Sequence, residues 1–211
     1  MAGTKQLNDT EGSAATIALI LNDDLYLSYI GDSSAILVRN KGKTVEKLSQ
    51  EIDLAAENQK EVERIEKSGG IVLKVGHTAR VQGELALTRS FGDSKYKAYI
   101  TSEPHIIHHK LTEENQDEFL LIATDGLWDV LSPEDAAKIM TEMKNVPENE
   151  IAEKLYEEAM SRNSTDNITV AVINLEKRRK LKMEGTFCPP SAPTSRYAKE
   201  NKKSFSFPPE F

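Results

Sequence analysis

Three aspartates stand beside turn residues at the ends of apolar segments, where carboxylates can hold a metal ion. Asp32 follows an apolar segment through a glycine, and Asp125 follows the apolar run 119–123 and precedes Gly126. Asp166 comes shortly before the last apolar segment. Oxygen ligands of this kind suit Mg²⁺ or Mn²⁺. Because aspartate is also a favoured turn residue, these positions alone leave open whether the acids converge or are solvated loop residues.

Apolar and turn patterns predict the elements that would position these acids. The unbroken run Phe119 to Ala123 predicts a strand that is buried on both faces. Ser132 and Pro133, followed by two acids, predict the N-cap and first turn of a helix over 133–143. Further helices are expected at 57–68 and 149–161, and strands at 14–21, 25–30, 35–38, 44–48, 71–75, near 80–82, from 106 and at 168–175. We interpret the first four strands as an antiparallel meander with short turns.

Composition places the chain among ordinary globular proteins and excludes several classes of function. The 211 residues are 38% hydrophobic and 29% charged, and they contain one cysteine, so a cysteine zinc site is excluded. No apolar run approaches the roughly 18–20 residues that span a bilayer, and no secretory signal is visible. We therefore expect no membrane partner and a cytoplasmic or nuclear location.

Charge is distributed unevenly along the chain. Residues 176–211 contain nine basic and four acidic residues, a net charge of +5. Because the net charge of the whole chain is −7, the first 175 residues carry a net charge of −12. An acidic body argues against nucleic acid as a partner, because that binding depends on basic groups that neutralise phosphates. The basic, Pro- and Ser-rich segment 176–211 is expected to be a disordered tail, and residues 1–11 a polar lead.

Six motifs occur in one order along the chain. They are Gly12-Ser-Ala-Ala, Ile30-Gly-Asp-Ser-Ser-Ala-Ile-Leu37, Gly83-Glu-Leu-Ala-Leu-Thr-Arg-Ser-Phe-Gly-Asp93, Glu103-Pro104, Ala123-Thr-Asp-Gly-Leu-Trp-Asp129 and Ser164-Thr-Asp-Asn-Ile-Thr-Val170. The series closely resembles the metal-dependent type-2C protein serine/threonine phosphatases (the PPM family), over residues 12–175. The resemblance implies an α+β fold, an α-β-β-α sandwich of two antiparallel sheets flanked by helices.

The resemblance also implies roles for individual residues. Asp125 and Asp166 would be direct ligands of Mg²⁺ or Mn²⁺, and Asp32 and Asp129 would support a further, weaker metal site. Asn167 and Gly126 would shape the surrounding turns. Arg89 and Asp93 match family positions, and we assign them a structural role. In the family, a water bound between two cations attacks the phosphorus of a phosphoserine or phosphothreonine in a phosphoprotein substrate.

The sequence departs from the family pattern by lacking the family's first half. That half carries a Glu-Asp pair, an Asp-Gly-His-Gly-Gly motif whose aspartate bridges both metals, the basic residue that grips the phosphate, and the histidine that protonates the leaving group. None of His77, His105, His108 and His109 stands in a matching context, and we expect loop or surface positions for them. No catalytic residue is therefore identified within the chain.

Two interpretations follow from this departure. In the first, the chain is the C-terminal part of a phosphatase catalytic domain, truncated and inactive or nearly so on its own. In the second, it is a non-catalytic regulatory or binding protein that keeps the phosphatase fold. In either case the sheets would lack strands, and association through unpaired sheet edges is expected.

Overall fold

The structure is a computed structural model that describes residues 11–49, 58–76 and 78–184. The chain divides into two units, Met1–Glu176 and Lys177–Phe211, each of which is described by itself. Most of the predicted polar lead and of the predicted tail, residues 1–10 and 185–211, lies outside the described residues. Among the residues that are described, no helix is long and apolar enough to cross a membrane.

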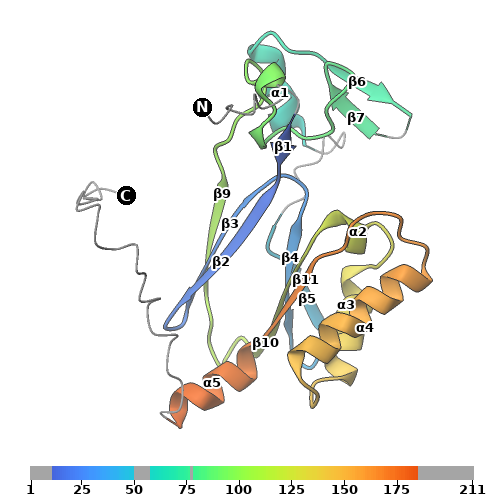
Figure 1. Cartoon of the computed structure of the whole chain (residues 1–211). Helices are drawn as coiled ribbons and strands as arrows, with labels where there is room; N and C mark the ends of the chain where they lie inside the picture. The colour runs from blue at the N-terminus through green and yellow to red at the C-terminus, as the bar shows by residue number, and fades with distance from the viewer. Residues whose placement is uncertain (1–10, 50–57, 77, 185–211) are drawn as a thin grey trace, which may run out of the picture. The chain divides into compact units, whose positions relative to one another are not determined.

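Two antiparallel sheets form the body of the first unit (Figure 1). The three-stranded sheet has the order β2-β3-β9, and the four-stranded sheet has the order β11-β10-β4-β5. The bounds of these strands are Ala15–Leu21 for β2, Asp24–Ile30 for β3, His105–Lys110 for β9, Val170–Asn174 for β11, Asp117–Ala123 for β10, Ser34–Arg39 for β4 and Thr44–Lys47 for β5. The predicted α+β class with antiparallel sheets and helices is confirmed.

Smaller elements complete the described part of the chain. Two short antiparallel pairs join β1 (Gly12–Ser13) to β8 (Phe91–Gly92) and β6 (Val72–Val75) to β7 (Thr78–Val81). The helices are α1 (Gln59–Lys67), α2 (Asp125–Trp128), α3 (Pro133–Glu142), α4 (Glu148–Ser161) and α5 (Leu175–Met183), with one 3₁₀ turn at Ser94–Tyr96.

The predicted meander is wrong at its centre. The hairpins β2-β3 and β4-β5 both form, but β3 and β4 belong to different sheets. Gly31 turns the chain between the sheets with a φ of +93°, and a Cβ there would lie 2.5 Å from the Cβ of Ala14. The physical reason for the crossing is burial: residues 34–38 of β4 are all buried, so the strand needs cover on both faces.

Each layer of the fold buries its own apolar cluster. Between the two sheets, Leu25 and Leu27 of β3 pack with Leu37 of β4 and Leu120 of β10. On the outer face of the four-stranded sheet, α3 and α4 cover β4 and β10 through Ala137, Met140, Ile151, Leu155 and Ala159. A third cluster joins α1 to β7 and the 3₁₀ turn through Ile65, Val81 and Tyr96.

The start of α3 forms as its sequence predicts. The Ser132 hydroxyl accepts a hydrogen bond from the Asp135 backbone N–H at 3.1 Å, and Pro133 occupies the first turn. This cap satisfies one of the backbone donors that a helix leaves unpaired at its N-terminus. It therefore fixes the start of α3, the second helix after strand β10.

Two further expectations are corrected. Residues 175–183 form the helix α5, so the predicted disordered tail does not begin at residue 176. This segment is rich in Lys, Arg and Leu, which have high helix propensity, and the prediction of a disordered tail did not take that propensity into account. His105 and His109 lie partly buried on strand β9 rather than in loops. His108 on the same strand is exposed, as expected for a surface residue, and His77 falls outside the described residues. His105 stacks on Tyr29 and His108 on Tyr26, and these two pairs lie on opposite faces of the sheet because residues three apart in a strand point to opposite sides.

Candidate metal centre

The chain segments that carry the predicted acids lie at one end of the four-stranded sheet. Asp125 opens α2 directly after β10, and Asp166 precedes β11, the neighbour of β10 (Figure 1). Ser34 pairs with Ala123, so Asp32, two residues before that pair, lies at the same end. The structure therefore brings the three chain segments to one end of this sheet, a point that their positions in the sequence alone leave open.

Hydrogen bonds join the Asp125 segment to the Asp166 segment. The Thr124 hydroxyl donates to the Asn167 carbonyl at 3.1 Å and accepts from the Thr169 N–H at 3.0 Å. The Ser164 hydroxyl donates to the Gly126 carbonyl at 2.6 Å. Gly126 allows this close approach, since a Cβ at that position would lie 2.5 Å from the Asn167 carbonyl oxygen. The two predicted ligands are thus carried by one cross-bonded unit.

Each of the two carboxylates is oriented by the amide that follows it. Asp125 Oδ1 accepts from the Gly126 N–H at 2.9 Å, and Asp166 Oδ1 accepts from the Asn167 N–H at 2.6 Å. Asp125 is half-buried, whereas Asp166 is exposed. Among the residues that the structure describes, each of these hydrogen bonds engages Oδ1 only.

The Trp128 indole fixes the turn from the other side. Its Nε1–H donates to the carbonyl of Ala123, the last residue of β10, at 3.0 Å. Asp129 follows on the same turn, where its N–H donates to the Asp125 carbonyl at 2.8 Å and its side chain is exposed. The turn 124–129 is therefore held at both of its ends.

The carboxylate oxygens of the predicted acids are of the type that binds a hard cation, but too few of them lie close together in the described part of the chain. Carboxylate oxygens are the ligands that Mg²⁺ and Mn²⁺ prefer, and Asp125 and Asp166 would hold such an ion. Among the described residues, however, no three His, Cys, Asp or Glu side chains gather closely enough to hold a metal ion. The assignment of Asp32, Asp125, Asp129 and Asp166 as metal ligands therefore stays a prediction.

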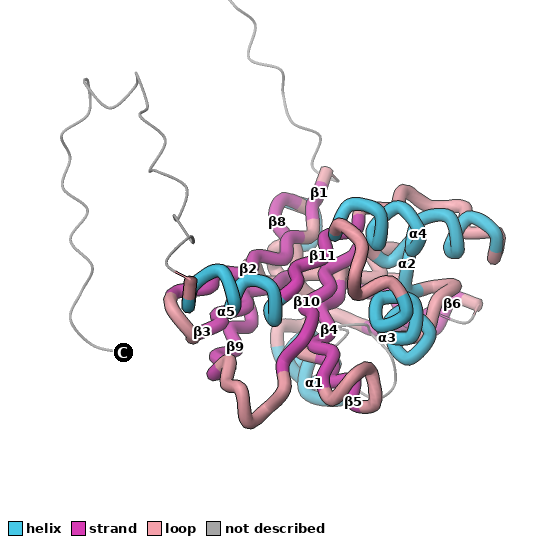
Figure 2. Tube along the Cα trace, turned by 90° about the horizontal axis from the view of Figure 1, so that it is seen from below, coloured by secondary structure: helices cyan, strands magenta, loops and turns pink. Residues whose placement is uncertain are grey.

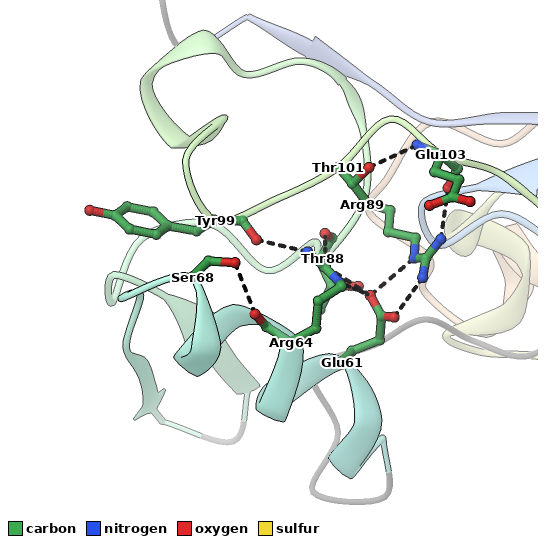
Figure 3. A network of polar contacts seen from close by, with 8 residues as sticks. All are labelled: Glu61, Arg64, Ser68, Thr88, Arg89, Tyr99, Thr101 and Glu103. Carbon is green, nitrogen blue, oxygen red and sulfur yellow. Dashed lines mark hydrogen bonds and ion pairs between the residues drawn. The ribbon is translucent and has the colours of Figure 1, made fainter.

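Arg89 belongs to an ion-pair network with Glu61 and Arg64 of helix α1 (Figure 3). Its guanidinium donates to both carboxylate oxygens of Glu61, at 3.0 and 2.8 Å, and to the Glu103 carbonyl at 2.8 Å. Arg64 donates to the same carboxylate at 2.9 Å and to the carbonyls of Thr88 and Tyr99. The network links helix α1 to the segments before and after the 3₁₀ turn.

The electrostatics of this network are set by burial and by two cations. Burial acts to raise the pKa of Glu61, but hydrogen bonds from Arg89 and Arg64, together with their charges, outweigh it and lower that pKa to about 2. The hydrogen bonds to Glu61 raise the pKa of Arg89. A carboxylate between two guanidinium groups stays ionised over the whole neutral range.

Asp93 is also engaged inside the protein. Its carboxylate is buried and accepts from the Ser90 hydroxyl at 2.5 Å, and its N–H donates to the Glu11 carbonyl at 2.7 Å. These bonds support the short pair β1-β8. The structural roles assigned to Arg89 and Asp93 stay a prediction.

Sequence reasoning missed several residues that organise the site and its support. Glu61 lies in the helix that the sequence predicts at 57–68, but the apolar and turn patterns that predict this helix assign no role to Glu61. The spacing of Glu61 and Arg64, three residues apart, could have indicated an ion pair. The bridging roles of Thr124 and Ser164 have no comparable signal, since their partners lie about forty residues away in sequence.

Comparison with known proteins supports the resemblance. The family model of Protein phosphatase 2C matches residues 2–168. Probable protein phosphatase 2C 69 of Arabidopsis thaliana is 41% identical over 172 residues, which cover 81% of this chain and 46% of the relative. The chain therefore belongs to the protein phosphatase 2C family.

Solved structures show the same fold. Serine-threonine phosphatase 2C from Toxoplasma gondii has a TM-score of 0.66 at 26% identity, over 79% of this chain and 59% of that one. A sex-determining protein of C. elegans has a TM-score of 0.68 at 25% identity, over 76% of this chain and 40% of that one. The chain spans 34–46% of the length of three curated relatives that it matches.

Proposed function

We propose that this chain carries part of the metal centre of a Mg²⁺- or Mn²⁺-dependent protein serine/threonine phosphatase. The observation that supports this is the cross-bonded unit of the Asp125 and Asp166 segments, placed at one end of the sheet in a chain of the protein phosphatase 2C family. The substrate class is a phosphoprotein with phosphoserine or phosphothreonine.

The chain's own residues would hold and orient a cation in this function. The amides of Gly126 and Asn167 fix one oxygen of each carboxylate and leave the other for the ion. Bound cations would supply an acidified water as the nucleophile and would screen the phosphate charge. Thr124 keeps the two carboxylate-bearing turns in register.

We further propose that these 211 residues have little or no phosphatase activity on their own. The family's bridging aspartate and its phosphate-gripping basic residue have no counterpart in the sequence. With two or three carboxylates from this chain, a cation would bind weakly, and a second cation would have no shared ligand.

Metal binding can be tested without any enzymatic readout. Trp128 is the chain's only tryptophan and lies in the same turn as Asp125, so it can sensitise the luminescence of bound Tb³⁺. We expect Tb³⁺ emission that Mn²⁺ displaces and that Asp125→Asn and Asp166→Asn each reduce. Asp23→Asn, in the turn at the far end of β3, is the control and should leave the emission unchanged. Emission that is absent, or that does not depend on Asp125, would contradict the metal centre.

Activity is tested by hydrolysis of a phosphopeptide with and without Mn²⁺, with Asp125→Asn as the control. We expect no Mn²⁺-dependent turnover from the folded chain alone. Turnover that Asp125→Asn abolishes would show that the chain is sufficient, and would contradict the proposed inactivity.

A non-catalytic regulatory role is the second candidate function, and one observation favours it. No three potential metal ligands gather among the residues that the structure describes. The part of the Arabidopsis relative that lies outside the aligned region, added in trans, separates the two functions. Mn²⁺-dependent activity that needs both polypeptides supports the phosphatase, whereas inhibition of a complete phosphatase by the chain supports the regulator.

A further inference from the structure

The last described helix, α5, carries a dense run of positive charge. It extends from Leu175 to Met183 directly after strand β11 (Figure 2), and five of the six residues 177–182 are Lys or Arg. The Protein phosphatase 2C family model matches residues 2–168, so this basic run lies outside the matched region. The candidate metal centre does not use it either. A role for the run must therefore come from its own charges and conformation.

The helical form spreads these charges around the helix instead of gathering them on one face. Successive residues of an α-helix are turned by about 100°, so the consecutive basic residues 177–180 point almost all the way round. The lysines of the run are exposed and its arginines are half-buried. Leu175 is buried, whereas Leu181 and Met183 are 37% and 74% exposed. The helix therefore lacks the separate basic and apolar faces of a helix that lies on a membrane.

The helical form also holds like charges close together. Lys177 and Lys180 are three residues apart, as are Arg179 and Lys182, and Arg178 and Lys182 are four apart. Like charges at these spacings destabilise a helix. A helix of nine residues is marginal in water by itself, and this one is buried only at its first residue. Opening the helix beyond its first turn therefore costs little free energy.

In an extended conformation the basic run becomes ordered into two rows. Side chains of an extended chain alternate between two sides, so Arg178, Lys180 and Lys182 would form one row of three cations. The opposite row would contain the other two basic residues and Leu181. A groove lined by carboxylates can contact both rows at once and accept charge-assisted hydrogen bonds from them. The extended form thus offers a partner more cations together than the helix does.

The basic side chains already have interactions within the chain. Each residue from 177 to 182 takes part in at least one. Exposed ion pairs of Lys and Arg contribute little stability one by one, because solvent screens them. A groove that presents several carboxylates at once can therefore replace such interactions.

The charge of the rest of the chain favours a protein groove over a broad anionic surface. Residues 1–175 carry a net charge of −12, from 18 basic and 30 acidic residues. A membrane or a nucleic acid that bound the basic run would bring many negative charges close to this acidic part of the chain, and the repulsion would oppose binding. A groove contacts the basic run alone and avoids most of that repulsion.

We propose that residues 177–182 are a nuclear-import signal, which an import carrier binds in an extended form through a carboxylate-lined groove. Short runs rich in Lys and Arg serve nuclear localisation. Of the two locations expected from composition, the proposal selects the nucleus. It does not depend on the phosphatase function, because it rests on the charges and conformation of one segment.

The first experiment follows the full chain in permeabilised cells, fused to a fluorescent protein large enough to prevent diffusion through nuclear pores. We expect nuclear accumulation that requires added cytosol and nucleotide triphosphates. Arg178→Ala combined with Arg179→Ala should slow it roughly tenfold, because two donors of charge-assisted bonds are lost. Lys41→Ala combined with Lys43→Ala, in the turn between β4 and β5, is the matched control: it removes two charges from exposed positions and should change nothing.

The second experiment separates the extended form from the helix. Leu181→Pro keeps all five positive charges, but proline interrupts a helix and favours an extended conformation of the residue before it. We expect accumulation that is as fast as that of the unaltered chain or faster. Loss of accumulation by this variant, with the circular dichroism of the sheets preserved, would show that the helix is recognised and would overturn the proposal.

The third experiment tests the other anionic partners. We expect the purified chain to bind neither vesicles of phosphatidylcholine and phosphatidylserine nor duplex DNA at physiological salt, where long-range attraction is screened. Binding to either one that the double arginine variant abolishes would overturn the proposal. So would a folded chain that stays outside the nucleus, or one that accumulates there without cytosol.

Discussion

The two sheets of this protein both bury apolar residues on their inner faces, but within the described residues only one of them has a covered outer face. Both bury leucines and other apolar residues in the space between them. The outer face of the four-stranded sheet is covered by α3 and α4, and its side chains are buried. The outer face of the three-stranded sheet exposes five large apolar side chains: Ile17 at 63%, Leu19 at 50%, Leu21 at 53%, Tyr26 at 38% and Ile106 at 69%.

Strand register explains why these five residues form one surface. Ile17 pairs with Ser28, and Ser28 pairs with Ile106. Two residues further along β2, Leu19 pairs with Tyr26. Side chains at alternate positions of a strand share a face, so these rows lie side by side. The difference between the sheets shows that apolar patterning sets which strand faces can be buried, while covering elements decide which faces are.

The largest expected effect tests this difference directly. Leu121 of β10 is fully buried beneath α3 and α4, so Leu121→Ala should lower the free energy of unfolding by about 3 kcal/mol. The same change at Leu19 should alter it by less than about 0.5 kcal/mol, because half of that side chain is already in solvent. Urea unfolding of both variants measures the two values. Equal losses would mean that the outer face of the three-stranded sheet is covered in solution.

The comparison extends from buried hydrocarbon to buried charge. Glu61→Gln should lower the free energy of unfolding at neutral pH by roughly 2–3 kcal/mol, because it removes the negative charge that pairs with the guanidinium groups of Arg64 and Arg89. Glu63→Gln on the same helix is the matched control: Glu63 is exposed, its ion pair with Lys67 is 3.7 Å long, and its loss should cost less than about 0.5 kcal/mol.

The Glu61 variant also predicts a pH dependence. Folding lowers the pKa of Glu61 from its ordinary value of 4.5 to about 2, so its ionised form stabilises the folded state above pH 4.5. That contribution is lost as the pH falls from 4.5 towards 2. The difference in unfolding free energy between wild type and Glu61→Gln should therefore shrink over this window. A difference that is constant with pH would contradict the lowered pKa.

A smaller effect is expected at the helix that covers the four-stranded sheet. Ser132→Ala removes the N-cap of α3 and should lower the free energy of unfolding by about 1 kcal/mol. Ser161→Ala at the end of α4 removes only an exposed bond to the Glu158 carbonyl and should change it by a few tenths of a kcal/mol. Thermal unfolding of the pair compares them, and an equal effect would show that the cap contributes nothing specific.

The smallest effect on stability is expected on the uncovered face. Ile106→Thr should change the free energy of unfolding by less than about 0.5 kcal/mol, because the side chain is mostly in solvent and threonine also suits a strand. It should nevertheless reduce the binding of an apolar fluorescent dye, since it interrupts the exposed patch. Unchanged dye fluorescence would place the accessible apolar surface elsewhere.

The sequence by itself determined the local elements and the family. The strand at the apolar run 119–123 and the helix start at Ser132–Pro133 depend on interactions between near neighbours, and each forms where it is predicted. Six ordered motifs identified the protein phosphatase 2C family because their residue types and order are improbable together. The position of the acids at strand ends also follows from local pattern.

Only the tertiary structure decided which strands share a sheet and which polar groups meet. The chain crosses from one sheet to the other at Asp32, because β4 needs burial on both faces, and no local signal indicates this. Thr124 forms a hydrogen bond with Asn167, 43 residues away in sequence, and Glu61 forms an ion pair with Arg89, 28 residues away. Such partners depend on the free energy of the whole packed arrangement. For the same reason, the exposed outer face of the three-stranded sheet could be located only once every strand had its place.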